Sequence, residues 1–206
     1  MFTRRTGALL LVSAVLFGGT FVAAKAGLAH LPPLLFVAVR FDIGAVVLAA
    51  FAATRLSRGE LRPRTRGDVV GIVATGAIVI GLTNALLFVG QQYVTSGVAA
   101  VVFSLNPILT PVFAAVLLSQ DGLSARGIVG MALGLFGVAL VADPDPAALL
   151  AGGVGVPLLF AAAVTSALGA VLIRRADATL SSTARTVWGV PLAAVLTHAM
   201  SLGAGE

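Results

Sequence analysis

Residues 104–111 read SLNPILTP, and they lie inside the apolar run GVAAVVFSLNPILTPVFAAVLL at residues 97–118. Two prolines four positions apart would break a helix in water. In lipid, prolines are tolerated where a neighbouring helix, a hydroxyl group or a wet cavity satisfies the carbonyl groups that they free. The solvent in which the chain folds therefore decides how this stretch is interpreted.

Composition identifies that solvent as a lipid bilayer. The chain of 206 residues is 59% hydrophobic and 10% charged, with a mean hydropathy of +1.08. Soluble domains carry about 25% charged residues, because a surface that faces water needs them. Cysteine is absent, so disulfides and thiolate metal sites are excluded. There is also no GxxxxGK[ST] phosphate loop, and we expect neither a cofactor nor a metal ion.

The apolar runs indicate an all-α, polytopic membrane protein. A helix needs about 20 mostly apolar residues to cross a bilayer. About seven runs approach that length, and the fifth is the shortest. The predicted transmembrane helices are residues 7–24, 34–54, 69–90, 94–118, 127–142, 153–173 and 185–204.

The placement of positive charge predicts the orientation. Loops that stay in the cytoplasm carry the excess of lysine and arginine. A cytoplasmic N-terminus puts most of the basic residues inside and predicts a multi-pass plasma-membrane protein. The same need explains the basic segment RLSRGELRPRTRGD at residues 55–68, so we expect no binding to nucleic acid. The inner basic residues would be Arg4, Arg5, Arg55, Arg58, Arg62, Arg64, Arg66, Arg126, Arg174, Arg175 and Arg185.

A weak internal repeat predicts how the chain is organised. The segment AVLFGGTFVAAK at residues 14–25 aligns with AVTSALGAVLIR at 163–174, and the same offset aligns 44–48 with 193–197. An odd number of helices separates the two copies, so the second would enter the membrane from the opposite side, as in inverted-repeat transporters. A counterpart in the membrane also argues that residues 7–24 are retained, although Arg4 and Arg5 followed by an apolar run resemble a signal peptide.

Two segments resemble a known family. The run FGGTFVAAKAGLAHLPPLLFVAVRF at residues 17–41 is similar to the start of EamA-type proteins of the drug/metabolite transporter superfamily. Residues 84–141 resemble the third to fifth helices of that domain, with TSGVAA at 95–100, a fourth helix that contains prolines and a glycine-rich fifth helix. The resemblance implies ten helices in two inverted five-helix repeats around a central cavity through which small metabolites move.

Measured against that pattern, the expected domains are a first five-helix repeat at residues 1–146 and a second repeat at 152–206. The second repeat would contain two helices and would be truncated after the seventh of ten.

The expected substrate pathway consists of polar, proline and aromatic residues within the predicted spans. Side chains spaced three, four or seven positions apart share one face of a helix. Polar groups on such a face are costly to leave unpaired in hydrocarbon. The pathway residues are Thr20, Arg40, Asp42, Asn84, Phe88, Ser104, Asn106, Pro107, Thr110, Pro111, Thr165 and Ser166.

Several of these residues allow a structural interpretation as well. Ionisable groups inside a membrane are rare and usually functional, but Arg40 could instead extend its side chain to the outer interface. Asn84 could bind substrate or a neighbouring helix. Arg40 and Asp42 are two positions apart and should not pair, so Lys25 is the expected partner of Asp42.

The glycines of the fifth run, Gly130, Gly134 and Gly137, favour close helix packing.

The sequence therefore predicts a membrane transporter of the drug/metabolite type that works by alternating access. The expected partners are the lipid bilayer, a small-molecule metabolite and either a second copy of the chain or the missing C-terminal helices. One alternative is a truncated fragment without independent transport. Another is an intramembrane enzyme, but the two histidines, His30 and His198, have no recognisable nucleophile motif. We expect no catalytic residue and no enzymatic activity.

Overall fold

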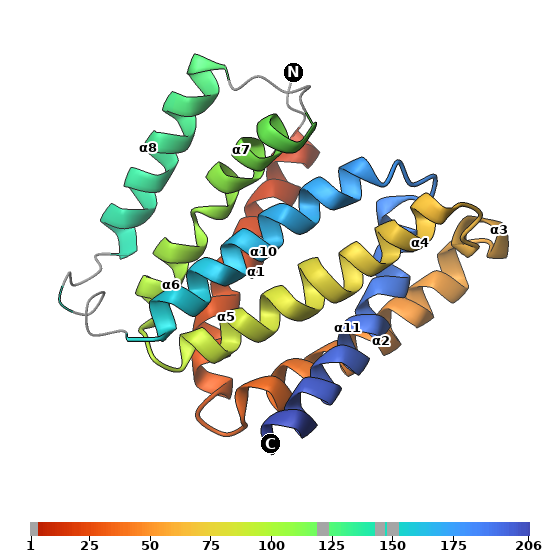
Figure 1. Ribbon diagram of the computed structural model, residues 1–206, viewed down its shortest axis with the longest axis horizontal. Helices are drawn as coiled ribbons and strands as arrows, with labels where there is room; N and C mark the ends of the chain where they lie inside the picture. The colour runs from red at the N-terminus through yellow and green to blue at the C-terminus, as the bar shows by residue number, and fades with distance from the viewer. Residues whose placement is uncertain (1–3, 119–123, 143–146, 148–152) are drawn as a thin grey trace.

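The computed structural model describes residues 4–118, 124–142, 147 and 153–206, and within these ranges it contains helices and no strands. Figure 1 shows the arrangement. The helices, in chain order, are α1 (Arg4–Gly27), α2 (Pro33–Arg55), α3 (Arg58–Leu61), α4 (Arg66–Val73), η1 (Ala74–Leu82), α5 (Thr83–Gln91), α6 (Ser96–Phe103), α7 (Asn106–Leu118), α8 (Ala125–Ala142), α10 (Gly155–Arg175) and α11 (Ser182–Ala204).

Six helical segments in the described ranges are long and apolar enough to cross a membrane. The third consists of α4, η1 and α5 joined end to end, and the fourth consists of α6 and α7. The fifth predicted span corresponds to α8, whose apolar part, Ala125–Leu140, is shorter than the other six. Multi-pass membrane insertion is thus supported by the structure, while the count of seven and the inverted repeat stay predictions.

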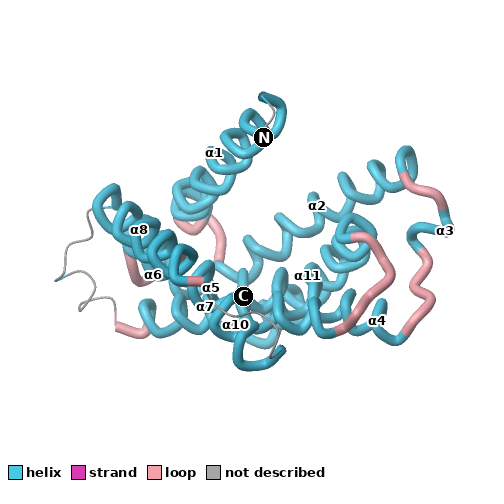
Figure 2. The backbone as a smooth tube through the Cα atoms, turned by 90° about the horizontal axis from the view of Figure 1, so that it is seen from above, coloured by secondary structure: helices cyan, strands magenta, loops and turns pink. Residues whose placement is uncertain are grey.

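Helix α10 lies at the centre of the packing. It contacts η1 and α5 on one side and α6 and α7 on the other. Helix α11 packs along α2 and η1, whereas α1 and α8 both contact α6 at the margin of the bundle (Figure 1). Figure 2 shows α1 and α2 diverging from the turn that joins them.

Apolar side chains cover much of the outer surface. On α1, Leu11 is 70% exposed and Val15 is 73% exposed. Soluble monomers rarely leave large contiguous apolar patches in water. The buried cluster forms where the end of α1, the start of α2 and α5 meet, around Phe21, Val37 and Phe88. This combination of a small core and an apolar exterior fits a chain surrounded by lipid.

Small residues set the closest helix crossing. A Cβ atom added to Gly76 on η1 would lie 2.6 Å from the carbonyl oxygen of Gly189 on α11. A side chain at Gly76 would collide with this backbone, so glycine there allows the two helices to approach closely. By contrast, a Cβ at Gly130, Gly134 or Gly137 of α8 meets nothing within 4 Å. The expectation that these three glycines pack closely is therefore wrong for the described part of the chain.

The SLNPILTP stretch interrupts the fourth span. Helix α6 ends at Phe103, and α7 begins at Asn106. Pro107 lies in the first turn of α7, where its missing N–H group is not needed. The Ser104 hydroxyl donates to the Val101 carbonyl over 2.6 Å, and the Thr110 hydroxyl donates to the Asn106 carbonyl over 2.9 Å. The break between the two helices thus comes just before Pro107, whereas Pro111 is accommodated inside α7, and hydroxyl groups satisfy nearby carbonyls.

The third span contains nine residues of π-helix, η1. The Thr83 hydroxyl donates to the carbonyl of Ile78, five residues earlier, over 3.0 Å. π-helical turns are rare and occur frequently near functional sites. This segment packs against α10 and α11 and therefore lies at the centre of the bundle.

Candidate functional site in the membrane spans

Arg40 joins α2 to α5 through a polar and aromatic cluster. Its Nη2 atom donates to Asn84 Oδ1 over 2.8 Å. Its guanidinium carbon lies 4.7 Å from the centre of the Phe88 ring and 5.4 Å from that of Phe41. Asn84 in turn donates to the Ile80 carbonyl over 2.7 Å. We call Arg40, Asn84 and Phe88 the Arg40 cluster.

The cation in this cluster has no acidic counter-charge within the described residues. The ion pair between Asp42 and His198 leaves Arg40 out. Arg40 is half-buried, and a guanidinium has five N–H donors, of which the contact to Asn84 uses one. Aromatic faces attract a cation but do not neutralise it. The cluster is therefore suited to receive an anionic group.

A second polar group lies at the helix break. Asn106 Nδ2 donates to the Ser166 hydroxyl over 2.6 Å and so joins α7 to α10. The Thr110 hydroxyl donates to Asn106 Oδ1 over 3.0 Å. Thr165 is half-buried on α10 beside Ser166, and Pro111 lies within α7. We call Asn106, Thr110 and Ser166 the Asn106 group.

An apolar cavity of about 870 Å³ opens next to this break. It lies between α1, α6, the start of α7 and α8. The polar side chains that reach it come from the SLNPILTP stretch and from Ser96. Its lining is Phe17, Gly18, Phe21, Val22, Ser96, Gly97, Ala100, Phe103, Ser104, Asn106, Pro107, Gly134, Gly137 and Val138.

The site residues predicted from the sequence therefore lie in separate regions of the structure. Ser104, Asn106 and Pro107 line the apolar cavity, whereas the Arg40 cluster lies outside its lining. Thr20 faces neither group, because its hydroxyl donates to the Leu16 carbonyl one turn earlier over 3.1 Å.

Asp42 pairs with a residue that the sequence did not suggest. His198 Nε2 lies 2.8 Å from Asp42 Oδ2, and the contact joins α11 to α2. The expectation that Lys25 pairs with Asp42 is wrong. Lys25 Nζ instead donates to the carbonyls of Gln91 and Val94, over 2.9 and 2.8 Å. Carbonyl groups at a helix C-terminus carry partial negative charge, which attracts the ammonium group.

Gln91 is a buried polar residue that the sequence analysis did not single out. It is fully buried, and its Nε2 atom donates to the Phe21 carbonyl of α1 over 2.7 Å. Its Oε1 atom has no hydrogen-bond partner among the residues that the structure describes. With Lys25, it connects the end of α1 to the end of α5.

Asp68 is a second residue that the sequence reasoning missed. Its side chain is fully buried at the start of α4. The carboxylate accepts from the N–H groups of Arg64 and Thr65, and across the bundle from those of Thr179 and Leu180 and from the Thr179 hydroxyl. The spacing of Thr65 and Asp68, a threonine three residues before an acid, is the sequence signal for the capping half of this arrangement. Asp68 thus ties the loop before α4 to the loop before α11.

The sequence of this chain is similar to those of known transporters. The sequence profile of the EamA-like transporter family matches residues 5–142. YvbV, an uncharacterized transporter of Bacillus subtilis (strain 168), is 28% identical over 188 residues, which cover 91% of this chain and 58% of that protein. An uncharacterized transporter of Archaeoglobus fulgidus is 26% identical over 184 residues, which cover 89% of this chain and 64% of that protein.

A third relative has a name that states its substrate. It is the S-adenosylmethionine/S-adenosylhomocysteine transporter of Chlamydia trachomatis, 28% identical over 196 residues that cover 91% of this chain and 59% of that protein. The chain thus spans between 58% and 64% of the length of these three relatives.

Proposed function

This chain belongs to the EamA-like transporter family, and from that premise we propose that it forms part of a carrier that moves a small metabolite across the plasma membrane by alternating access. Multi-pass architecture and relatives named as transporters support the carrier class. The same relatives are consistent with a role that is not enzymatic.

The single observation that carries the proposal furthest is the Arg40 cluster. An arginine within a membrane span is costly unless it is compensated, and such residues usually mark substrate pathways. Asn84 and the Phe88 ring hold the guanidinium in place but supply no negative charge. We infer that the substrate carries an anionic group, such as a carboxylate or phosphate, that supplies the missing charge. A guanidinium binds both groups in a forked geometry.

The Asn106 group and the helix break are the proposed moving part of the pathway. The break between α6 and α7 leaves a point where the fourth span can bend without losing regular helical hydrogen bonds. Asn106 couples that point to α10 through Ser166. Apolar walls beside it would accept the non-ionic part of the substrate.

The proposed orientation puts the N-terminus in the cytoplasm. Basic residues gather where α2 ends, α4 begins and α10 ends, and positive charge favours the cytoplasmic side. Because the chain spans less than two thirds of its relatives, we propose that the complete carrier also needs further helices or a second copy. The alternative is a fragment that does not transport by itself.

Transport into proteoliposomes tests the function. The chain and a chimera that continues after residue 206 with the remaining part of the Bacillus subtilis relative would be assayed with labelled organic anions, zwitterions and cations. We expect the chimera to move compounds that carry an anionic group. Arg40→Gln should lower the rate about tenfold or more, while Arg40→Lys should retain part of it. Arg126→Gln, which removes an exposed charge at the start of α8, serves as the matched control.

The outcomes separate the parts of the proposal. Transport of cations alone, or transport unaffected by Arg40→Gln, would refute the anionic substrate but leave the carrier intact. No transport of any compound by the chimera would refute the carrier. Equal transport by the chain and the chimera would refute the need for further helices.

A further inference from the structure

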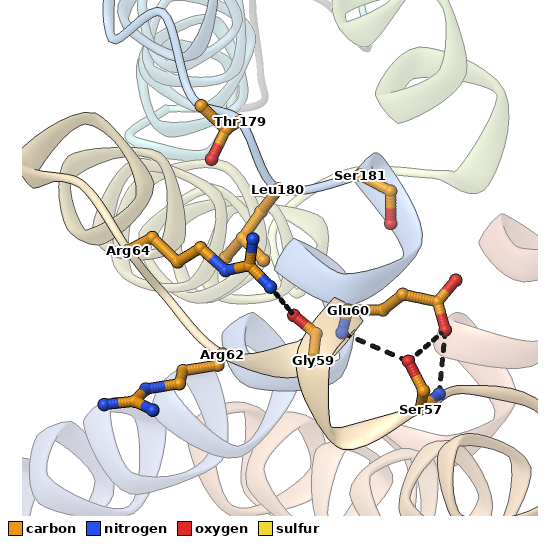
Figure 3. A pocket seen from close by; sticks show the side chains of 8 residues that line it. All are labelled: Ser57, Gly59, Glu60, Arg62, Arg64, Thr179, Leu180 and Ser181. Atoms are coloured by element: carbon orange, nitrogen blue, oxygen red, sulfur yellow. Dashed lines mark hydrogen bonds between the residues drawn. The ribbon is translucent and has the colours of Figure 1, made fainter.

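Two loops lie side by side at the end of the bundle where α2 ends and α11 begins. The first covers residues 56–65 and includes α3, and the second covers residues 176–181. Asp68 holds them together through its bonds to both loops. Between them lies a cavity of about 450 Å³, seen in Figure 3, and its lining is Ser57, Gly59, Glu60, Arg62, Arg64, Thr179, Leu180 and Ser181.

The two arginines of this cavity offer many unused donors. Arg64 Nη2 donates to the Gly59 carbonyl over 3.2 Å, which leaves most of its N–H groups free. Arg62 is exposed, and among the described residues its guanidinium has no hydrogen-bond partner or ion pair. The Ser181 hydroxyl oxygen accepts from the Ala184 N–H over 3.1 Å, so its own hydrogen is also available.

The single acid in the lining is already engaged. Ser57 donates to Glu60 Oε2 through its backbone N–H over 2.8 Å and through its hydroxyl over 2.7 Å. These bonds lower the pKa of Glu60 below its ordinary value, because they stabilise the charged carboxylate. Arg55, Arg58 and Arg66, all exposed, add positive charge around the cavity. The site is therefore a basic pocket between two loops that Asp68 holds together.

In the proposed orientation, the cavity lies beyond the ends of the candidate spans, at the border between membrane and water. Trp188, one and a half turns into α11, is 47% exposed, and its indole N–H donates to the Leu61 carbonyl of the first loop over 2.7 Å. Tryptophan is enriched at the level of the lipid headgroups. A basic pocket at that level faces the phosphates of anionic lipids.

We propose that this cavity binds a phosphate group, supplied by the headgroup of an anionic phospholipid. Arginine forks match phosphate oxygens in pairs, and serine and threonine hydroxyls add single donors. A volume of about 450 Å³ would accept a headgroup phosphate with its glycerol. The same chemistry would accept soluble phosphate, and the two sources can be separated by experiment.

Native mass spectrometry of the purified chain, titrated with phosphatidylglycerol or with phosphatidylcholine, tests the site. We expect phosphatidylglycerol to be retained preferentially. The double variant Arg62→Gln, Arg64→Gln should bind it about 30-fold more weakly, because each arginine near the membrane surface strengthens such binding several-fold. The control, Arg4→Gln with Arg5→Gln, loses the same charge away from the cavity and should change binding less than about threefold.

A second measurement identifies the source of the phosphate. Thermal unfolding of the chain would be followed with inorganic phosphate up to millimolar concentration, with chloride at equal ionic strength as the reference. Stabilisation by phosphate that is lost in the cavity variant, without preference for phosphatidylglycerol, would assign the pocket to soluble phosphate and overturn the lipid source. Equal loss of lipid in both double variants would overturn the site itself, because only total charge would then matter. Circular dichroism of each variant checks that it is folded.

Discussion

Asp42 on α2 and His198 on α11 face each other with Oδ2 and Nε2 2.8 Å apart. The two positions are 156 residues apart in the chain, and both are within membrane-spanning helices. This contact therefore fixes the rotation of α11 against α2 at one polar point in an apolar interface.

A double-mutant cycle should show that the two residues are coupled. Asp42→Asn and His198→Gln, alone and together, should give a coupling free energy of about 0.6–1.7 kcal/mol for unfolding in bicelles, the range found for hydrogen bonds between membrane helices. Asp42→Asn combined with His30→Gln is the control, because His30 lies in the turn before α2. A coupling indistinguishable from this control would contradict the contact.

Asp68→Asn should loosen the two loops at the basic end of the bundle. An amide has one acceptor oxygen and would present its NH₂ group to the N–H donors of Thr179 and Leu180. We expect the Tm to fall by about 5–10 °C, since buried groups that lose charged hydrogen bonds are costly.

The matched control for Asp68 is Asp177→Asn in the same loop. Asp177 has a φ of +48°, a conformation that asparagine adopts readily, and its side chain is exposed. This variant should leave the Tm unchanged. A similar fall in both variants would show that the buried carboxylate has no special role.

Gly76→Ala should disturb the crossing of η1 and α11. The added methyl group would collide with the backbone of Gly189, and no flexible side chain can move aside. We expect a loss of about 1–3 kcal/mol in the free energy of unfolding, the usual effect of overpacking. Gly130→Ala, which meets open space on α8, should cause no such loss and should stabilise by up to about 1 kcal/mol, because alanine favours the helix over glycine. Equal effects at the two positions would mean that Gly76 has no tight neighbour.

Lys25→Met should weaken the attachment of α1 to α5. The variant keeps an unbranched side chain, one atom shorter, but removes the ammonium group from the carbonyls of Gln91 and Val94. A cation at a helix C-terminus contributes about 1 kcal/mol. Hydrogen exchange of residues 88–94 should therefore accelerate about fivefold in the variant, and Lys25→Arg should restore most of the protection. Unchanged exchange in Lys25→Met would exclude this role.

The sequence was sufficient to locate the long apolar helices. Hydropathy runs are local, and six of the predicted ranges end within three residues of the helical segments Thr6–Gly27, Pro33–Arg55, Arg66–Gln91, Ser96–Leu118, Gly155–Arg175 and Ser182–Ala204. The interruption at SLNPILTP was also foreseeable, because proline removes a specific hydrogen bond.

Contacts between distant helices were not foreseeable in the same way. Charge alone suggested Lys25 as the partner of Asp42, but helix rotation brings His198 there instead. Glu206 accepts from the N–H groups of Leu34 and Leu35 at the start of α2, a pairing across more than 170 positions that no local pattern reveals. The π-helix of η1, a segment that packs against α10 and α11, was likewise not predicted from the sequence.

The most direct test of the account is which side of the membrane each loop faces. Because the chain contains no cysteine, a thiol reagent can label only the cysteine that is introduced. Single variants Ala29→Cys, Gln92→Cys, Gly59→Cys and Ala178→Cys would be treated in intact cells with a maleimide that cannot cross membranes. Ala29 lies between α1 and α2, and Gln92 follows α5, whereas Gly59 is in α3 and Ala178 lies between α10 and α11. Figure 1 shows the α1–α2 turn and the end of α5 at the opposite end of the spans from α3 and the α10–α11 loop. We predict labelling of the first two in intact cells, and of the last two only after permeabilisation. Labelling of Gly59→Cys and Ala178→Cys in intact cells, or equal labelling of all four, would contradict a carrier that crosses the membrane with its N-terminus inside.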